Sequence, residues 1–202
     1  TLAMVFQKPS NRTRVSFEQG MLQLGGHVIH IQPHEIGLGK REPIRDIAGV
    51  LSRYVDAIMI RANDHADVEE LARYATIPVI NGLSDLTHPC QALADLLTIQ
   101  ERFGSLTDQT LCYIGDGNNV CQSLITATDL LGIPMRVCTP KGYEPKEIGQ
   151  AEYVSDPQDT VRGASVVYTD TWISMGQESD SVARLKDFKG YKVTQELMGS
   201  AS

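Results

Sequence analysis

Residues 111–131, LCYIGDGNNVCQSLITATDLL, decide the fold class of this chain. The segment opens with four apolar residues, turns through a glycine-rich stretch, and continues with apolar residues three or four positions apart. A short apolar run is typical of a buried strand, and the later spacing predicts a helix. Strand, tight turn and helix in this order form part of a βαβ unit, in which successive strands are parallel.

The same pattern extends in both directions along the chain. Other short runs rich in Val and Ile predict strands at residues 3–6, 28–31, 57–60, 79–80, 135–138 and 166–168. Helical spacing appears at residues 44–51, 68–75 and 91–103. The sequence therefore predicts an α/β protein with parallel sheets flanked by helices.

A polar break containing Gly104, Ser105 and Asp108 follows the predicted helix at 91–103. Such a break between periodic segments is typical of a loop or linker. We therefore expect two domains, residues 1–104 and 105–202, the first incomplete at its N-terminal end and the second at its C-terminal end.

Composition restricts the class of partner. The 202 residues carry a net charge of -7, with 42% hydrophobic and 21% charged residues, and contain no basic run. This balance disfavours nucleic acid and indicates a small-molecule partner. No apolar run approaches the roughly 18 residues of a membrane span, so we expect a soluble protein. The four cysteines lack zinc or disulfide spacing and indicate reduced thiols inside a cell.

The sequence SNRTR, residues 10–14, joins a predicted strand to a predicted helix with Phe17, Met21 and Leu24 on its apolar face. Arginines at a helix N-terminus are electrostatically unfavourable unless an anion lies among them, and a phosphate would meet this need. Arg61, at the end of another predicted strand, is a second candidate. The alternative is a serine cap with solvated arginines, and an ordinary surface charge at Arg61.

The sequence HPCQ, residues 88–91, follows another predicted strand and leads into a helix. The imidazole of His88 and the amide of Gln91 could hydrogen-bond a carbonyl oxygen and an amino group. The alternative is a histidine that caps a loop.

The glycines in GDGNN, residues 115–119, suggest a dinucleotide site, but the pattern departs from one in detail. Val120 stands where the third glycine is needed, and the next strand lacks the acidic residue that holds a ribose. Asn119 and Asp170 instead follow two strand ends and could hold opposite ends of an amino acid. A loop-capping role is the alternative for Asp170.

These segments, in this order, resemble the aspartate/ornithine transcarbamylase family. Its phosphate loop reads STRTR, and its second motif reads HPxQ. The sequence DTWISMGQ, residues 170–177, resembles the Ser-Met-Gly loop of the ornithine branch. The resemblance implies transfer of the carbamoyl group of carbamoyl phosphate to the side-chain amine of L-ornithine, giving L-citrulline and phosphate. It implies no metal and no organic cofactor.

The resemblance also assigns site residues. Those that would bind phosphate are Ser10, Asn11, Arg12 and Thr13. Those that would hold the carbamoyl group are Arg61, His88 and Gln91, of which Arg61 and His88 would be catalytic. Those that would bind ornithine are Asn119, Asp170, Ser174 and Met175. Asn11 stands where the family has threonine, and Arg14 is expected to be structural.

Two expectations concern the whole protein. The family continues to a His-Cys-Leu-Pro motif and a later arginine, so we expect this chain to be a fragment. The resemblance also implies a homotrimer and a cytoplasmic location, with an organellar transit peptide left open. The alternatives are a transcarbamylase for putrescine or aspartate, and a non-catalytic subunit that binds anions.

Overall fold

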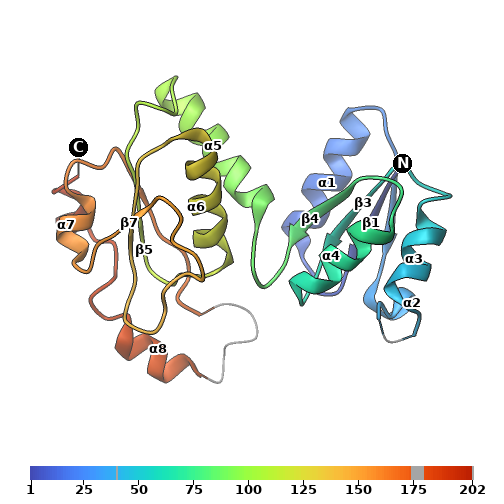
Figure 1. Ribbon diagram of the computed structural model, residues 1–202. Coiled ribbons are helices and arrows are strands. Elements are labelled where there is room, and N and C mark those ends of the chain that lie inside the picture. Colours follow the sequence, from blue (N-terminus) through green and yellow to red (C-terminus); the bar gives the residue numbers. More distant parts are fainter. Residues whose placement is uncertain (40, 174–179, 202) are drawn as a thin grey trace. The chain divides into compact units, whose positions relative to one another are not determined.

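The computed structural model describes residues 1–39, 41–173 and 180–201 (Figure 1). Residue contacts divide the chain into two compact units, unit 1 (Thr1–Cys90) and unit 2 (Gln91–Ser202). The strands in these residues are β1 (Leu2–Phe6), β2 (Val28–Ile31), β3 (Ala57–Arg61), β4 (Val79–Leu83), β5 (Leu111–Ile114), β6 (Met135–Cys138), β7 (Glu152–Tyr153) and β8 (Val166–Tyr168). The helices are α1 (Asn11–Gln23), α2 (Pro33–Ile36), α3 (Ile44–Leu51), α4 (His65–Tyr74), α5 (Pro89–Phe103), α6 (Asn119–Leu131), α7 (Pro157–Val161), α8 (Ser181–Asp187) and α9 (Gln195–Met198).

Unit 1 contains a parallel sheet with the strand order β2-β1-β3-β4. Successive residues of β1 point to opposite faces, so Ala3 and Val5 join a core with α3 and α4. Leu2, Met4 and Phe6 pack on the other face, against α1. Both faces of β1 are therefore buried, which explains its uninterrupted apolar sequence.

The strand order places a switch point in the sheet of unit 1. From β1 the chain reaches β2 through α1, on one face, and then crosses to β3 through α3, on the other face. Connections that leave in opposite directions open a crevice between the carboxyl ends of β1 and β3. The residues that follow β1 and end β3 therefore lie where open α/β sheets bind ligands.

Unit 2 repeats this arrangement with the strand order β7-β6-β5-β8, again all parallel. Leu111 and Tyr113 of β5 pack against α6, whereas Cys112 and Ile114 pack against α7 and α9. The chain leaves β5 for β6 on one face and returns to β8 on the other. A second switch point therefore lies between the carboxyl ends of β5 and β8.

The predicted fold class, parallel sheets flanked by helices, is confirmed. The structure extends the predicted strand at 79–80 to Leu83 and adds the two-residue strand β7, which is too short to give a periodic signal. The helix expected to carry Phe17, Met21 and Leu24 on its apolar face ends at Gln23, one residue before Leu24, and Leu24 is 85% exposed. The contact-based division at Cys90 lies within α5, and the proposed domain boundary at residue 104 stays a prediction.

No helix in residues 1–39, 41–173 and 180–201 combines the length and apolar character needed to cross a membrane.

Candidate functional site

In unit 1, the candidate site begins at the N-terminus of α1. Ser10 caps this helix: its side-chain oxygen accepts from the backbone N–H of Thr13 at 3.4 Å and donates to the Thr13 hydroxyl at 3.0 Å. The first turn contains no acidic residue to complement the helix dipole. The free N–H groups of this turn therefore have no negative partner within their own helix.

Arg61 reaches the same place from the end of β3. Its Nη1 donates to the Thr13 hydroxyl at 3.2 Å, and the residue is only 6% exposed. Its Nε is buried, and the described residues offer it no hydrogen-bond partner. Burial, with a smaller contribution from the nearby charge of Arg12, lowers the pKa of Arg61. An anion here would pair with the guanidinium and relieve its repulsion with Arg12.

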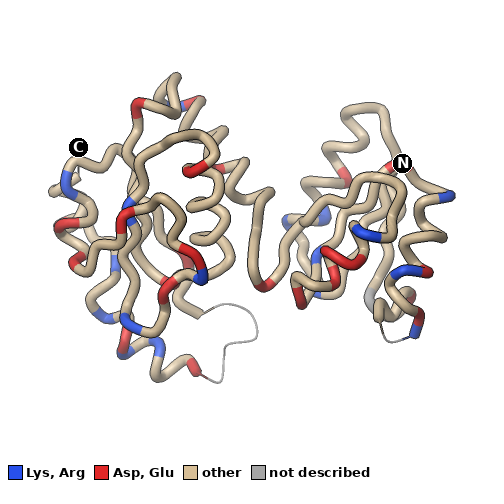
Figure 2. The backbone as a smooth tube through the Cα atoms, viewed as in Figure 1, with Lys and Arg blue, Asp and Glu red and all other residues tan. Residues whose placement is uncertain are grey.

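This positive site is local. Figure 2 shows acidic and basic residues scattered along both units, with no continuous basic stripe. In the same helix, Arg14 pairs with Glu18 at 3.2 Å on the surface, so its charge is already matched. Arg12 and Arg61 therefore differ from Arg14 in lacking a carboxylate ion pair in the described residues.

The remaining phosphate and carbamoyl candidates occupy loops and first turns. Asn11 and Arg12 are exposed in the first turn of α1. His88 is half-buried in the segment between β4 and α5. The structure thus brings together Ser10, Thr13 and Arg61 in unit 1, whereas Gln91 falls in unit 2.

In unit 2, Asn118 and Asp170 meet at the second switch point. Asn118 caps α6 by accepting from the backbone N–H groups of Val120 and Cys121, and its Nδ2 donates to Asp170 Oδ2 at 2.9 Å. Asp170 Oδ1 accepts from the backbone N–H of Thr171 at 2.7 Å. Both carboxylate oxygens are therefore oriented by the turns that follow β5 and β8.

A second polar group in unit 2 surrounds Gln91, in the first turn of α5. Its Nε2 donates to Asp95 Oδ1 at 2.9 Å. Burial raises the pKa of both Asp95 and Tyr168, and the nearby charge of Asp170 acts in the same direction on each. Gln91 and Asp170, predicted for different substrates, therefore belong to one polar cluster.

Sequence reasoning missed a buried ion pair that supports the amino-acid side. Arg184 of α8 donates from Nη1 to Asp116 Oδ2 and to the carbonyl of Trp172, both at 2.8 Å. Its guanidinium also lies 4.9 Å from the ring centre of Tyr143. Burial raises the pKa of Asp116, although the hydrogen bond and charge of Arg184 act in the opposite direction. No periodic signal could link positions 68 residues apart.

Gly117, in the turn after β5, is required by a close approach of the backbone. A Cβ atom at this position would lie 2.3 Å from the nitrogen of Pro145 and 2.6 Å from the carbonyl oxygen of Tyr143. The glycine that suggested a nucleotide site therefore allows the segment at 143–145 to pack on the turn that carries Asn118.

Two predicted ornithine residues, Ser174 and Met175, lie outside the described residues. Asn119 is the first residue of α6, whereas its neighbour Asn118 makes the contact with Asp170. In residues 1–39, 41–173 and 180–201, no cluster of three or more His, Cys, Asp or Glu side chains could hold a metal ion.

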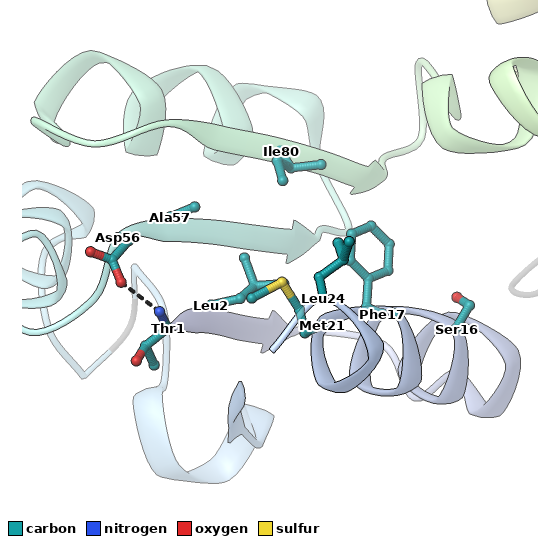
Figure 3. Close-up of a pocket in the computed structure, with 10 residues that line it drawn as sticks. Thr1, Leu2, Ser16, Phe17, Met21, Leu24, Asp56, Ala57 and Ile80 are labelled. Carbon is teal, nitrogen blue, oxygen red and sulfur yellow. Dashed lines mark hydrogen bonds and ion pairs between the residues drawn. The ribbon is translucent and has the colours of Figure 1, made fainter. Parts of the chain in front are cut away.

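Unit 1 also has an apolar hollow of about 470 Å³, away from this chemistry (Figure 3). Phe17, Met21 and Leu24 line it from the side of α1, and Leu2 and Ala57 line it from the first residues of β1 and β3. It therefore lies toward the amino ends of the strands, opposite the edge where α/β sheets place polar ligand sites.

Comparison with protein families gives two matches that together cover nearly the whole chain. Residues 1–101 match the carbamoyl-P binding domain of aspartate/ornithine carbamoyltransferase, and residues 107–202 match the Asp/Orn binding domain.

Individual relatives agree with this match. The chain is 52% identical to an ornithine carbamoyltransferase from Archaeoglobus fulgidus, over 98% of this chain and 67% of that protein. The ornithine carbamoyltransferase structure from Pyrococcus furiosus is 50% identical, with a TM-score of 0.94, and the alignment covers 100% of this chain and 68% of that one. The corresponding structure from Thermus thermophilus has 45% identity and a TM-score of 0.90, over 99% and 68% of the two chains.

Proposed function

Because this chain belongs to the aspartate/ornithine carbamoyltransferase family and is a carbamoyltransferase, we propose that it transfers the carbamoyl group of carbamoyl phosphate to the side-chain amine of L-ornithine. The products are L-citrulline and phosphate. The observation that carries the proposal is the buried guanidinium of Arg61, with an unpaired Nε, beside Arg12 at an uncompensated helix N-terminus.

The phosphate of carbamoyl phosphate binds at the first turn of α1. Ser10, Asn11, Arg12 and Thr13 provide backbone N–H groups, hydroxyls and one guanidinium in this turn. Support comes from the contact of Ser10 with Thr13 and from the absence of an acidic residue in the turn. Hydrogen bonds from charged donors to phosphate are the strong class, and the helix dipole acts in the same direction.

The carbamoyl group is held by Arg61, His88 and Gln91. Arg61 and His88 are the catalytic residues, since they stabilise the negative charge that develops on the carbonyl oxygen. The contact between Arg61 and Thr13 supports this role, because it places a residue proposed for the carbamoyl group beside one proposed for the phosphate.

The amino-acid substrate is held by Asn119, Asp170, Ser174 and Met175. Asp170 is the candidate partner for a cationic amine, and its hydrogen bonds with Asn118 and Thr171 support the assignment by orienting the carboxylate. The names of the relatives favour ornithine over aspartate or putrescine as the second substrate.

The reaction is a direct acyl transfer. The neutral amine attacks the carbamoyl carbon and a C–N bond forms. The tetrahedral intermediate expels phosphate as the C–O bond breaks, and the attacking nitrogen gives up one proton, which leaves with the phosphate. The amine must first lose a proton, since an alkylammonium has a pKa of about 10.4 in water. We therefore expect the rate to rise toward alkaline pH. Rate enhancement comes from positioning and from charges fixed before the reaction.

The test supplies the gene product with carbamoyl phosphate and, separately, ornithine, putrescine or aspartate. We expect the protein to form citrulline from ornithine. With putrescine or aspartate, kcat/KM should be at least tenfold lower. Preferential use of putrescine or aspartate would contradict the proposed substrate. A domain division near residue 104, a homotrimer and a cytoplasmic location remain further predictions, testable by limited proteolysis, sedimentation and cell fractionation.

A further inference from the structure

Gln91 and Asp95 form a directed pair on α5. They are four residues apart and therefore lie on one face of the helix, where Nε2 of Gln91 donates to Oδ1 of Asp95 at 2.9 Å. Ala92, Leu96 and Ile99 bury the adjoining face of α5, so the pair projects from a fixed helix. The orientation of the Gln91 amide matters for recognition, because its NH2 group donates hydrogen bonds and its oxygen accepts them.

An ionised carboxylate can only accept hydrogen bonds. The side chain of Gln91 must therefore turn its NH2 group toward Asp95, which leaves Oε1, an acceptor, for another group. A carbamoyl head carries an NH2 donor and a carbonyl acceptor. With Asp95 in place, Oε1 of Gln91 can accept a hydrogen bond from the carbamoyl NH2 group. The Gln91 NH2 group, which already faces Asp95, is not directed toward the carbamoyl carbonyl.

Asp95 lies near the end of β8 in the sheet of unit 2. Burial, together with the nearby charge of Asp95, raises the pKa of Tyr168 at this strand end, and the Tyr168 ring stacks on Tyr113 with 5.7 Å between ring centres. Asp95 Oδ2 is buried and has no hydrogen-bond partner in the described residues. An exposed helical pair that serves only stability would not bury a carboxylate oxygen in this way, because burying an unpaired polar atom is unfavourable.

We propose that Asp95 is a positioning residue, which fixes the side chain of Gln91 so that its oxygen accepts a hydrogen bond from the NH2 group of carbamoyl phosphate. Asp95 touches no substrate and acts through Gln91. This inference rests on the proposed function, since it requires carbamoyl phosphate to be the substrate. Its consequence is selectivity for a carbamoyl over an acetyl group, which has the same shape but carries CH3 in place of NH2.

The experiment measures dissociation constants of carbamoyl phosphate, acetyl phosphate and inorganic phosphate for the wild-type protein and its variants. Asp95→Asn keeps the shape of the side chain but can donate as well as accept, and Asp95→Ala removes the partner altogether. Glu101→Gln, an exposed residue of the same helix, is the matched control. Thermal melting shows whether each variant folds. If one Asp95 variant does not fold, the dissociation constants of the other decide the test.

The expected result is a roughly threefold to tenfold fall in the preference for carbamoyl over acetyl phosphate in the Asp95 variants, the range of one neutral hydrogen bond. Affinity for inorganic phosphate should stay within about twofold, and Glu101→Gln should match the wild type. Combining Asp95→Asn with Gln91→Met should lower the preference no further than Gln91→Met alone, because Asp95 acts through Gln91.

An unchanged preference in folded Asp95 variants, or equal weakening of all three ligands, would overturn the positioning role while leaving the proposed function intact. Wild-type protein that binds inorganic phosphate without preferring carbamoyl phosphate over acetyl phosphate would overturn the positioning role as well. Wild-type protein that forms no citrulline and binds no carbamoyl phosphate would instead overturn the proposed function.

Discussion

Asn118 and Asp170, 52 positions apart in the sequence, are joined by a hydrogen bond of 2.9 Å between Nδ2 and Oδ2. Each residue follows a strand, and the two strands, β5 and β8, are neighbours in the sheet of unit 2. The contact orients the carboxylate that we propose for the amine of the second substrate.

Asp170→Asn should therefore impair ornithine use preferentially. Loss of a charged hydrogen bond weakens binding by about 1.5–3 kcal/mol, which corresponds to roughly a 10- to 150-fold rise in KM for ornithine. The KM for carbamoyl phosphate should change by less than about threefold. Steady-state kinetics with each substrate varied provide the measurement, and exposed Asp108→Asn is the control. Equal losses for both substrates would contradict a role specific to ornithine.

Arg12 and Arg14, two residues apart in α1, should respond differently to alanine substitution. Arg12 has no carboxylate partner in the described residues and lies near Arg61, whereas Arg14 pairs with Glu18. Arg12→Ala should weaken carbamoyl phosphate by about tenfold or more in calorimetry, and Arg14→Ala by less than about twofold.

The Arg12→Ala and Arg14→Ala variants also test the repulsion between Arg12 and Arg61 in the absence of substrate. In phosphate-free buffer, Arg12→Ala should melt at the wild-type temperature or above it, because the substitution removes repulsion with Arg61. The rise in melting temperature on adding phosphate should be smaller than in the wild type. A large loss of stability without phosphate would mean that Arg12 supports the fold instead.

Arg184→Met should destabilise unit 2, because it leaves Asp116 buried without its cation. The side chains of Arg184 and Asp116 are 10% and 7% exposed, and breaking such a pair from one side costs about 3–5 kcal/mol. Lys186→Met, an exposed position of the same helix, should change stability by less than about 0.5 kcal/mol. Denaturant unfolding measures both, and adding Asp116→Leu to Arg184→Met should recover part of the loss. No recovery would indicate that packing against Tyr143 dominates.

Gly117→Ala and Gly49→Ala should have opposite effects on stability. At Gly117 the new methyl group would overlap backbone atoms of residues 143–145, which cannot move aside cheaply. We expect a loss of several kcal/mol or a displaced turn, with reduced ornithine use. Gly49 lies within α3 with open space around the new methyl group, so alanine should stabilise by about 0.5–1 kcal/mol. Thermal melting of both variants tests the contrast.

Stability should fall at alkaline pH through the buried thiols. Burial raises the pKa of Cys112 from 9.0 to about 11, so this thiol keeps its proton in the folded state after the unfolded chain has lost it. Its contribution to stability is complete below pH 9 and is lost as pH rises through 11. Cys112→Ala should flatten the fall of unfolding free energy between pH 9 and 11 by at most about 1.4 kcal/mol per pH unit. An identical slope in the variant would exclude this thiol as a source.

Local patterns in the sequence were sufficient to predict the helices and strands and the chemical types of the site residues. Short apolar runs separated by helical periods predicted parallel sheets, and the structure has them, because burial of both faces requires continuous apolar strands. The arginines at a helix start indicated an anion before any contact was known, because the field of a helix N-terminus is a local property. Gln91 was predicted as a site residue from its motif, whereas its partner Asp95, one helical turn away, was not.

Which of these groups meet depends on the order of the strands in the folded sheets. The orders β2-β1-β3-β4 and β7-β6-β5-β8 bring Thr13 to Arg61 and Asn118 to Asp170, and strand order leaves no periodic trace in a sequence. The structure also shows the hydrogen bond between Asn118 and Asp170, and the ion pair of Arg184 with Asp116 in the turn after β5. The physical reason is that the local spacing of apolar residues indicates which face of a helix or strand a residue lies on. Which distant residue it contacts depends on the path that the chain takes between the two.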